Sequence, residues 1–584
     1  MTTVATGEAS PQQSSDHRPG RLQGPVVRQG VRALVGAAVL GFLLQARYGY
    51  QAGTGDHWVL SLKGISWADP TAFANDWFNT SAPQPHWLFD IVTWAGATIG
   101  HLGAVYFAYW VLALLVFGLA TAILAERWAP QAPLAATVGV SVLLPMGMLT
   151  LLGTTNPALA IAIPNTLGGF LAYLTLACVI TRRDRAAFVA ATATSLVHVQ
   201  LGAIVAVALL LAVALLRARA GRVHWWLLAG CLSSAAFAVF GLKLRPITGT
   251  GADFVQVCNE VIPFHCAAVT WPVGRLWGGV ALLLLSLLTV LYYHGADLRV
   301  WAALTAIPVL GLLTAVMLDR FQVPVLGPLV QSTNAYRIGV ILYCLAPWGV
   351  VAPLLTGGSR RRTGLVLVAA VCTFGFLASL SDYSAFGSRP ALAVTAAVGL
   401  GAAGVAGLWL GRRRPRWYPT AGVGLLAAFV VVGGFGSGQL KWRPLHTQFG
   451  PSAAELSFGA AVRSAVPTGQ VILVPPWLDW ARLATRRAVV VDCKTVPYGG
   501  APWHEYLRRI DALGGLGTCK STRLFYGVPA TQLEAAARDF GARYLVTYRR
   551  DPRIGVLRTD GWVVRVPVTA SFGGLTLLQA PAGS

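Results

Sequence analysis

The feature that most constrains this chain is a series of apolar segments, each of about 20 residues, that runs from residue 30 to residue 440 with polar loops between them. A helix of that length spans the apolar part of a bilayer. Only 11% of the residues are charged, against about 25% in a soluble domain, and the mean hydropathy is +0.60. We therefore predict an all-α membrane domain of about thirteen transmembrane helices over residues 30–440.

Arginine clusters indicate how these helices are oriented. They lie in polar loops between apolar segments, which is typical of cytoplasmic loops. The clusters are Arg182, Arg183 and Arg185; Arg217, Arg219 and Arg222; Arg360 to Arg362; and Arg412 to Arg416. All of them share one side if the run Ala186–Leu216 forms two short helices that turn near His198–Gly202. The amino end is then cytoplasmic and the carboxyl end lies outside, in a multi-pass protein of the plasma (inner) membrane.

The formal net charge of +23 does not by itself indicate nucleic-acid binding. No soluble segment combines a basic face with interleaved aromatic residues, so no nucleic-acid partner is expected. The lipid bilayer is the partner that the composition predicts.

The two ends of the chain differ from the membrane domain. Residues 1–29 are rich in Ser, Gln, Gly and Pro without apolar periodicity, which predicts a disordered cytoplasmic tail. Residues 441–584 alternate short apolar runs with helical patterns, which predicts an extracytoplasmic α/β domain with its own core. The expected strands are Gln470–Pro475, Ala488–Asp492, Tyr544–Tyr548, Trp562–Val568 and Leu575–Leu578. The expected helices are Ala453–Val462, Trp503–Ile510 and Thr531–Phe540.

The first outer loop, residues 51–100, concentrates acids and aromatic residues. Asp56 and His57 directly follow the first apolar helix, and Asp76 lies in the sequence NDWF. Transfer of a sugar to a hydroxyl needs a base, and a carboxylate suits this role where partial burial raises its pKa. The alternative is structural, because such acids also cap short helices, including an interfacial helix that we expect at His86–Gly100.

The order of these segments resembles the GT-C superfamily of membrane glycosyltransferases: one apolar helix, an outer loop that opens with an acid, many further helices and an outer α/β domain. The loop GDHW…ADPTAFANDWF also resembles the GDH…DP…ND loop of uncharacterised bacterial membrane proteins related to that superfamily. The resemblance implies that a sugar is taken from a polyprenyl-phosphate carrier on the outer face, with Asp56 as the base. Asp-His stands here where many members have an acidic pair, so use of a divalent metal stays open; no cofactor is expected.

A lipid-phosphate donor needs cations near the outer interface, where arginine is a favoured partner. Arg337, in QSTNAYRIG, is the first candidate, and the others are Arg320, Arg245 and Lys243. Each of them could instead extend to the interface from a helix end. His198 and Gln200, at the expected helical turn, either line the donor cavity or satisfy the broken helix backbone. No second ligand accompanies His198, and no metal site is predicted.

Aromatic faces suit sugar rings, and the candidates for binding the acceptor are Trp58, Trp77, Trp503 and His504. The last two belong to DCKTVPYGGAPWHEYLRR, for which a purely structural role is the alternative. Cys258 with Cys266, and Cys493 with Cys519, lie in segments expected outside the membrane, where disulfides form.

These features together predict a membrane glycosyltransferase that moves a sugar from a polyprenyl-phosphate donor to a glycan, lipid or protein acceptor of the cell envelope. One alternative is a transporter or flippase for a lipid-linked glycan. It would be expected to carry broken helices in two matching halves, whereas the sequence offers one helical hairpin. The other alternative is a non-catalytic envelope scaffold whose outer domain binds a partner.

Overall fold

The computed structural model describes residues 25–355, 364, 368 and 418–581, except for residues 83–84, 148–149, 222, 245–248, 293–297, 437 and 570–571. Several sequence-based predictions lie wholly or almost wholly outside the described residues. They concern residues 1–24 of the predicted tail, the spans at 363–380 and 391–410, Arg222, Arg245, and the clusters Arg360 to Arg362 and Arg412 to Arg416. The last five residues of that tail, 25–29, are helical and not disordered as predicted.

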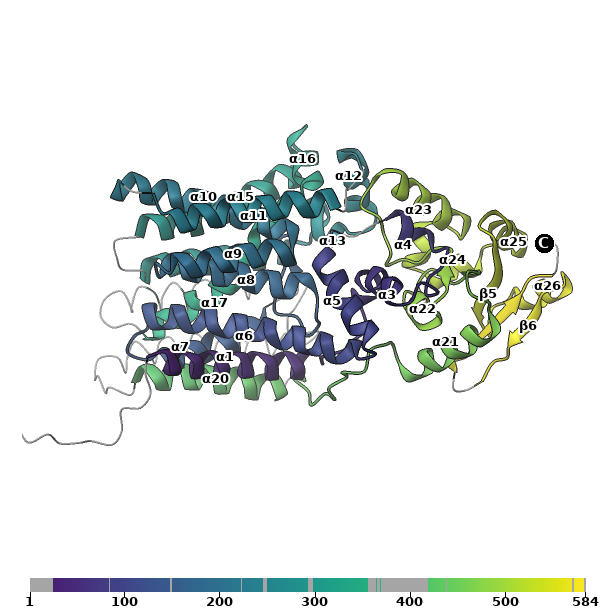
Figure 1. The fold of residues 1–584 in the computed structure, drawn as a ribbon, viewed down its shortest axis with the longest axis horizontal. Coiled ribbons are helices and arrows are strands. Elements are labelled where there is room, and N and C mark those ends of the chain that lie inside the picture. Colours follow the sequence, from purple (N-terminus) through teal and green to yellow (C-terminus); the bar gives the residue numbers. More distant parts are fainter. Residues whose placement is uncertain are drawn as a thin grey trace, which may run out of the picture.

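A bundle of helices forms one half of the molecule (Figure 1). Its helices are α1 (Pro25–Arg47), α6 (Leu102–Trp128), α7 (Pro133–Leu143), α8 (Pro164–Ile180), α9 (Asp184–Val197), α10 (Val199–Ala220), α11 (Trp225–Leu244), α14 (Val273–Leu288), α15 (Leu298–Arg320), α17 (Val340–Leu355) and α20 (Tyr418–Gly436). Six described helices are long and apolar enough to cross a membrane, and four shorter apolar helices accompany them. The protein is therefore a multi-pass membrane protein, and the predicted count of about thirteen spans is supported in part.

Two of the predicted spans are shorter than expected. The span predicted at Ala135–Leu152 ends as a helix at η1 (Leu144–Met146) and continues into a hairpin of β1 (Thr150–Leu151) and β2 (Thr154–Thr155). The span predicted to begin at Ala158 begins at Pro164. Proline fixes φ and lacks an N–H group, so it is tolerated at the first position of a helix and interrupts a helix interior.

The run at residues 186–216 forms two helices, as predicted. Helix α9 ends and α10 begins at His198, which has the extended backbone angles φ −146° and ψ 103°. The His198 side chain accepts a hydrogen bond from the Leu201 N–H, so it caps α10 and satisfies a backbone donor at the break.

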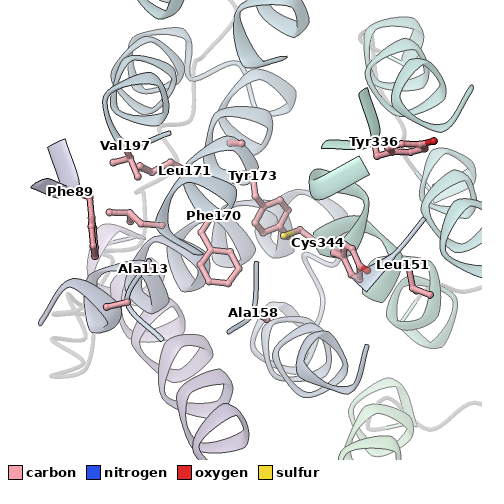
Figure 2. Close-up of a cluster of buried hydrophobic side chains, with 14 of the residues drawn as sticks. Phe89, Ala113, Leu151, Ala158, Phe170, Leu171, Tyr173, Val197, Tyr336 and Cys344 are labelled. Atoms are coloured by element: carbon pink, nitrogen blue, oxygen red, sulfur yellow. The ribbon is translucent and has the colours of Figure 1, made fainter. Parts of the chain in front are cut away.

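Close approach between helices is achieved with small residues and buried aromatic rings. A Cβ atom at Gly118 in α6 would lie 2.1 Å from the Ala33 carbonyl oxygen in α1, so only glycine permits this contact. Figure 2 shows part of the bundle core, in which Phe170 and Tyr173 are fully buried. The Trp348 Nε1–H donates to the Tyr173 hydroxyl over 2.7 Å, which satisfies a donor that no water can reach.

The two ends of the bundle carry different polar groups. At the end where α1 begins, Arg32 pairs with Glu126 at 2.6 Å and His224 contacts Asp184 at 2.8 Å. Short helices cover the other end and face the carboxyl-terminal part of the chain (Figure 1). They are α2 (His57–Leu60), α3 (Leu62–Ala68), α4 (Trp77–Ser81), α5 (Trp87–Thr98), α12 (Gly251–Glu260), α13 (Pro263–Cys266) and α16 (Leu326–Ser332).

The carboxyl-terminal part is built on a five-stranded sheet with the order β4-β3-β5-β7-β6. Strand β3 pairs in parallel with β4 and β5, and β7 pairs antiparallel with β5 and β6. The strands coincide with the five predicted runs: β3 (Val471–Leu473), β4 (Ala488–Val489), β5 (Ala542–Tyr548), β6 (Val563–Val566) and β7 (Leu575–Gln579). The helices are α21 (Ala453–Ala465), α22 (Ala481–Thr485), α23 (Gly500–Ala512), α24 (Thr522–Tyr526), α25 (Ala530–Asp539) and α26 (Ile554–Thr559), with the 3₁₀ turn η5 (Leu516–Cys519).

Alternate residues of the strands face two separate cores. Ile472 and Val546 belong to the cluster that contains α21 and α22, whereas Leu473 and Leu545 belong to the cluster that contains α23 and α25. A side-chain period of two explains this division. The sheet is therefore buried on both faces, and the second face is continuous with the core of the bundle.

Candidate active site

The first outer loop packs directly against the carboxyl-terminal part of the chain. The Asp56 carboxylate lies 2.7 Å from the Lys494 ammonium, and the Asn75 side chain donates to the Gly469 carbonyl over 2.9 Å. The backbones of Gln51 and His446 also form an isolated parallel β-bridge. Direct contact requires the loop and this part of the chain to lie on the same side of a membrane.

Charged and aromatic side chains from five separate segments meet at this contact. We call the group the polar junction; it consists of Asp56, His86, His265, Arg337, Lys494 and Tyr498. Each of these groups acts electrostatically on others in the set, and Asp56 acts on all five. The segments that contribute them are the start of α2, the start of α5, α13, η4 (Ala335–Gly339) and the loop between β4 and α23, which carries both Lys494 and Tyr498.

Asp56 occupies the amino-terminal cap position of α2 but does not cap it, because its side chain accepts no hydrogen bond from the helix backbone. The carboxylate is paired with Lys494 instead, and the Asp56 side chain remains 47% exposed. Burial alone would raise the Asp56 pKa, but the Lys494 ammonium outweighs burial and holds that pKa below its usual range. The expectation that burial would raise this pKa is therefore wrong.

Lys494 is held in place by its neighbours in the chain. The Asp492 carboxylate accepts hydrogen bonds from the backbone N–H groups of Lys494 and Thr495, over 3.0 and 2.8 Å. A disulfide joins Cys493 to Cys519 immediately before it. Burial would lower the Lys494 pKa, yet the Asp56 carboxylate keeps it above its usual value, so the pair is ionic.

Arg337 lies in η4, at the start of a membrane-spanning segment. Its guanidinium donates to the Asn165 side-chain oxygen over 3.2 Å. Asp319 holds this segment in place: it is fully buried and accepts a hydrogen bond from the hydroxyl of the neighbouring Tyr336 over 2.6 Å. Gln200 donates to the carbonyls of Thr333 and Asn334, each over 3.3 Å. Gln200 thus supports the loop that carries Arg337.

Several polar atoms around Arg337 are buried and have no hydrogen-bond partner among the described residues. They are Nδ1 of His86, Nδ1 of His265, Nδ2 of Asn165 and Oδ1 of Asn334. The His86 ring centroid lies 4.8 Å from that of His198, and Cys266 beside His265 forms a disulfide with Cys258. Buried polar groups are normally satisfied by protein, water or ligand. The region around Arg337 can therefore accept a polar ligand.

His57 is a positioning residue in this structure. Its ring is fully buried, Nδ1 accepts from the Gly53 N–H over 2.9 Å, and Nε2 donates to the Ala162 carbonyl over 2.7 Å. Both ring nitrogens are thus occupied, and burial lowers the pKa to about 4. A neutral, fully bonded imidazole ties the loop after α1 to the segment before α8.

This burial makes the stability of the protein depend on pH. His57 has a pKa of about 4 in the folded chain against an ordinary value of 6.5. Between these values the unfolded state binds more protons, so stability falls as the pH falls, by about 3 kcal/mol once pH 4 is reached. We expect the unfolding temperature, measured by intrinsic fluorescence, to drop over this window, and to drop less in His57→Asn. Equal slopes in the two proteins would contradict this assignment.

Asp76 is fully buried and forms an ion pair with Arg482, whose Nε lies 2.7 Å from Oδ2. The same carboxylate accepts the N–H groups of Asn79, at the start of α4, and of Val489, in β4. Arg482 is also fully buried and pairs with Asp492. Asp76 therefore caps a helix and anchors the first outer loop to the sheet, which was the alternative to a catalytic role.

The candidates for acceptor binding are placed differently from one another. Trp77 and Trp503 are 8% and 0% exposed, and their indole N–H groups donate to the Val490 carbonyl and the Gln256 side chain. Their ring faces are packed within the protein and are closed to a sugar. Trp58 is half-buried and donates to the Gly53 carbonyl over 3.1 Å. His504 is exposed and lies 3.5 Å from Asp253.

The remaining cationic candidates are not in the polar junction. Arg320 donates to the carbonyls of Ala268 and Val269 in η2 (Ala268–Thr270). Lys243 is exposed at the end of α11. Among the residues that the structure describes, no three His, Cys, Asp or Glu side chains are grouped as metal ligands.

Sequence reasoning missed four members of the polar junction as site residues: His86, His265, Lys494 and Tyr498. Lys494 and Tyr498 lie in the polar stretch DCKTVPYGGAPWHEYLRR, whose density of charge was a usable signal. His86 and His265 are isolated in their own segments, and nothing in the sequence around either of them indicates that they lie near Asp56.

Comparisons with known proteins give limited matches. A domain of unknown function, DUF6798, matches residues 453–513, which include α21, β3 and α23. No curated protein sequence matches the chain.

The solved structures of ArnT and EmbB are among those similar to this chain. The crystal structure of ArnT from Cupriavidus metallidurans bound to undecaprenyl phosphate has 15% identity and a TM-score of 0.44 over 95% of this chain and 98% of ArnT. The apo form of ArnT has 15% identity and a TM-score of 0.40 over the same shares of the two chains. The arabinosyltransferase EmbB from Mycobacterium smegmatis has 18% identity and a TM-score of 0.42 over 73% of this chain and 42% of EmbB.

Proposed function

We propose that this protein is a membrane glycosyltransferase of the GT-C type that moves a sugar from a polyprenyl-phosphate donor to a cell-envelope acceptor on the outer face. The observation that carries the proposal is the polar junction, in which the solvent-accessible Asp56 carboxylate faces two cations, Lys494 and Arg337. A base beside a pair of cations at the outer end of a helix bundle is the arrangement that transfer from a lipid phosphate requires.

In the proposed reaction Asp56 takes the proton of an acceptor hydroxyl. The hydroxyl oxygen attacks the anomeric carbon of the donor sugar and forms the new glycosidic bond. The bond between the anomeric carbon and the phosphate oxygen breaks, and its electron pair leaves with the polyprenyl phosphate. Arg337 and Lys494 stabilise the charge that develops on this phosphate. The proton thus ends on Asp56, the sugar on the acceptor oxygen and the electron pair on the polyprenyl phosphate.

The Asp56–Lys494 ion pair describes the protein before the donor binds. A phosphate near Arg337 competes with Asp56 for the Lys494 ammonium, because a phosphate offers more charge and more acceptor oxygens than one carboxylate. Donor binding then releases Asp56 to accept a proton from the acceptor. His86 and His265, whose pKa values burial lowers to about 4 and about 3, stay neutral and can bond to sugar hydroxyls.

Lys494 is expected to set the acid limb of the pH–rate profile. Replacing it by methionine leaves Asp56 with its burial but without the ammonium that lowers its pKa. The Asp56 pKa should rise, so the acid limb of kcat/KM should move to higher pH. The control is Lys520→Met, which removes an exposed lysine from the same part of the chain. An acid limb that stays in place in Lys494→Met would contradict the role of this pair.

The proposal itself is tested with the purified protein in nanodiscs. Radiolabelled hexosyl and pentosyl polyprenyl phosphates are supplied together with cell-envelope membranes as the source of acceptor. Release of polyprenyl phosphate together with label in an envelope product is the expected result. A scaffold releases no polyprenyl phosphate, and a flippase moves the donor across the bilayer intact, so either of these outcomes would overturn the proposal.

A further inference from the structure

A second polar site lies where the first outer loop meets α21 and α22. It is a pocket of about 390 Å³. We call it the arginine pocket; its charged lining consists of Asp69, Arg463, Arg486 and Arg487, and Thr71 and Thr468 add hydroxyl groups. None of its lining residues belongs to the polar junction.

The arginine pocket has an excess of positive charge. Arg463 and Arg487 donate to backbone carbonyls, including Arg463 to Ala484 and Arg487 Nε to Val466 over 2.9 Å. Among the residues that the structure describes, none of the three arginines forms an ion pair. Asp69 is the one acid that acts on Arg486 and Arg487. Burial and the nearby Arg463 lower the Arg486 pKa to about 10. Three guanidinium groups against one carboxylate leave a net charge of +2 to be neutralised.

The arginines are held in position before any ligand arrives. Arg486 has the left-handed backbone angles φ 54° and ψ 29°, which an arginine adopts only when its surroundings require it. Its carbonyl accepts the Phe73 N–H over 3.3 Å, and its guanidinium lies 5.8 Å from the centroid of the Phe73 ring. This turn brings the consecutive side chains of Arg486 and Arg487 to the same pocket. Rigid donors lose little freedom on binding.

The charge, the donors and the volume together favour one class of ligand. Guanidinium groups bind phosphate oxygens through paired N–H donors. A net charge of +2 matches a phosphate monoester dianion better than a single carboxylate. The volume exceeds that of a bare phosphate and lies within the range of small-molecule sites. We infer that the arginine pocket binds a phosphate monoester carried on a sugar or glycerol scaffold, independently of the proposed glycosyl transfer.

Binding is measured on the full chain in phosphatidylcholine nanodiscs by isothermal titration, with glucose 6-phosphate as the probe. Wild type is expected to bind it, and Arg486→Gln is expected to weaken binding about tenfold through loss of one charge-assisted contact. Arg543→Gln, which removes an exposed arginine of β5, is the matched control. Asp69→Asn should tighten binding because it removes the one opposing charge. Destabilisation of the variant cannot produce such a gain in affinity.

Two further binding experiments identify the chemical class of the ligand. Glucuronate, which offers a carboxylate on a similar ring, should bind more weakly than glucose 6-phosphate. Nanodiscs that contain phosphatidic acid should compete with glucose 6-phosphate if the phosphate belongs to a lipid head group, and should not compete if it belongs to a glycan. The inference is overturned if wild type does not bind glucose 6-phosphate, if glucuronate binds as tightly, or if Arg486→Gln binds like Arg543→Gln.

Discussion

Replacing Asp56 by asparagine should reduce glycosyl transfer by about 10²- to 10⁴-fold, which is the usual contribution of a general base. The asparagine oxygen can still accept a hydrogen bond from Lys494, so the contact between the first outer loop and the carboxyl-terminal part should persist. The measurement is release of polyprenyl phosphate by wild type and Asp56→Asn at equal protein concentration. The thermal unfolding of both proteins is recorded in parallel.

The control for this experiment is Asp560→Asn, which removes an exposed carboxylate beyond α26. Its transfer rate should equal that of wild type. Full activity in Asp56→Asn would refute the assignment of Asp56 as the base. If Asp56→Asn loses activity and its unfolding midpoint is also clearly lower than that of wild type, Asp56 has a structural role instead.

Replacing Arg482 by methionine should lower the free energy of unfolding by about 3–5 kcal/mol, which is the usual cost of breaking a buried ion pair by removing one partner. Arg482 is fully buried between Asp76 and Asp492. Methionine fills much of the same volume but leaves two buried carboxylates without their cation. The thermal unfolding midpoint of the protein in nanodiscs measures the effect, with Arg543→Gln as a surface control.

Asp76→Asn provides a graded comparison. The two N–H groups bond to different oxygens of Asp76, Asn79 to Oδ1 and Val489 to Oδ2, so the single asparagine oxygen can keep one of them. Arg482 keeps Asp492 as a partner. Its destabilisation should therefore be smaller than that of Arg482→Met. Equal unfolding midpoints for wild type and Arg482→Met would show that this network does not hold the first outer loop to the sheet.

Local pattern was sufficient to predict much of the fold. The apolar run at residues 186–216 was correctly divided into α9 and α10 because basic clusters flank it on both sides. The strands β3 to β7 were correctly located because short apolar runs of β-branched residues are bounded by turn residues. Disulfides join the two cysteine pairs that the sequence offered. In contrast, α7 and α8 are shorter than predicted, because hydropathy averages over the prolines and glycines of residues 144–164.

The sequence by itself determined a bundle of apolar helices, an α/β sheet and a first outer loop rich in acids, because hydropathy, periodicity and turn residues are properties of neighbouring positions. Only the tertiary structure decided which cation each of Asp56 and Asp76 meets. Asp56 and Asp76 are similar in sequence context, yet one pairs with Lys494 at an accessible surface and the other is buried against Arg482. The partner cations lie more than 400 positions away in the chain, and the energy of a carboxylate depends on the charges and the solvent around it in space.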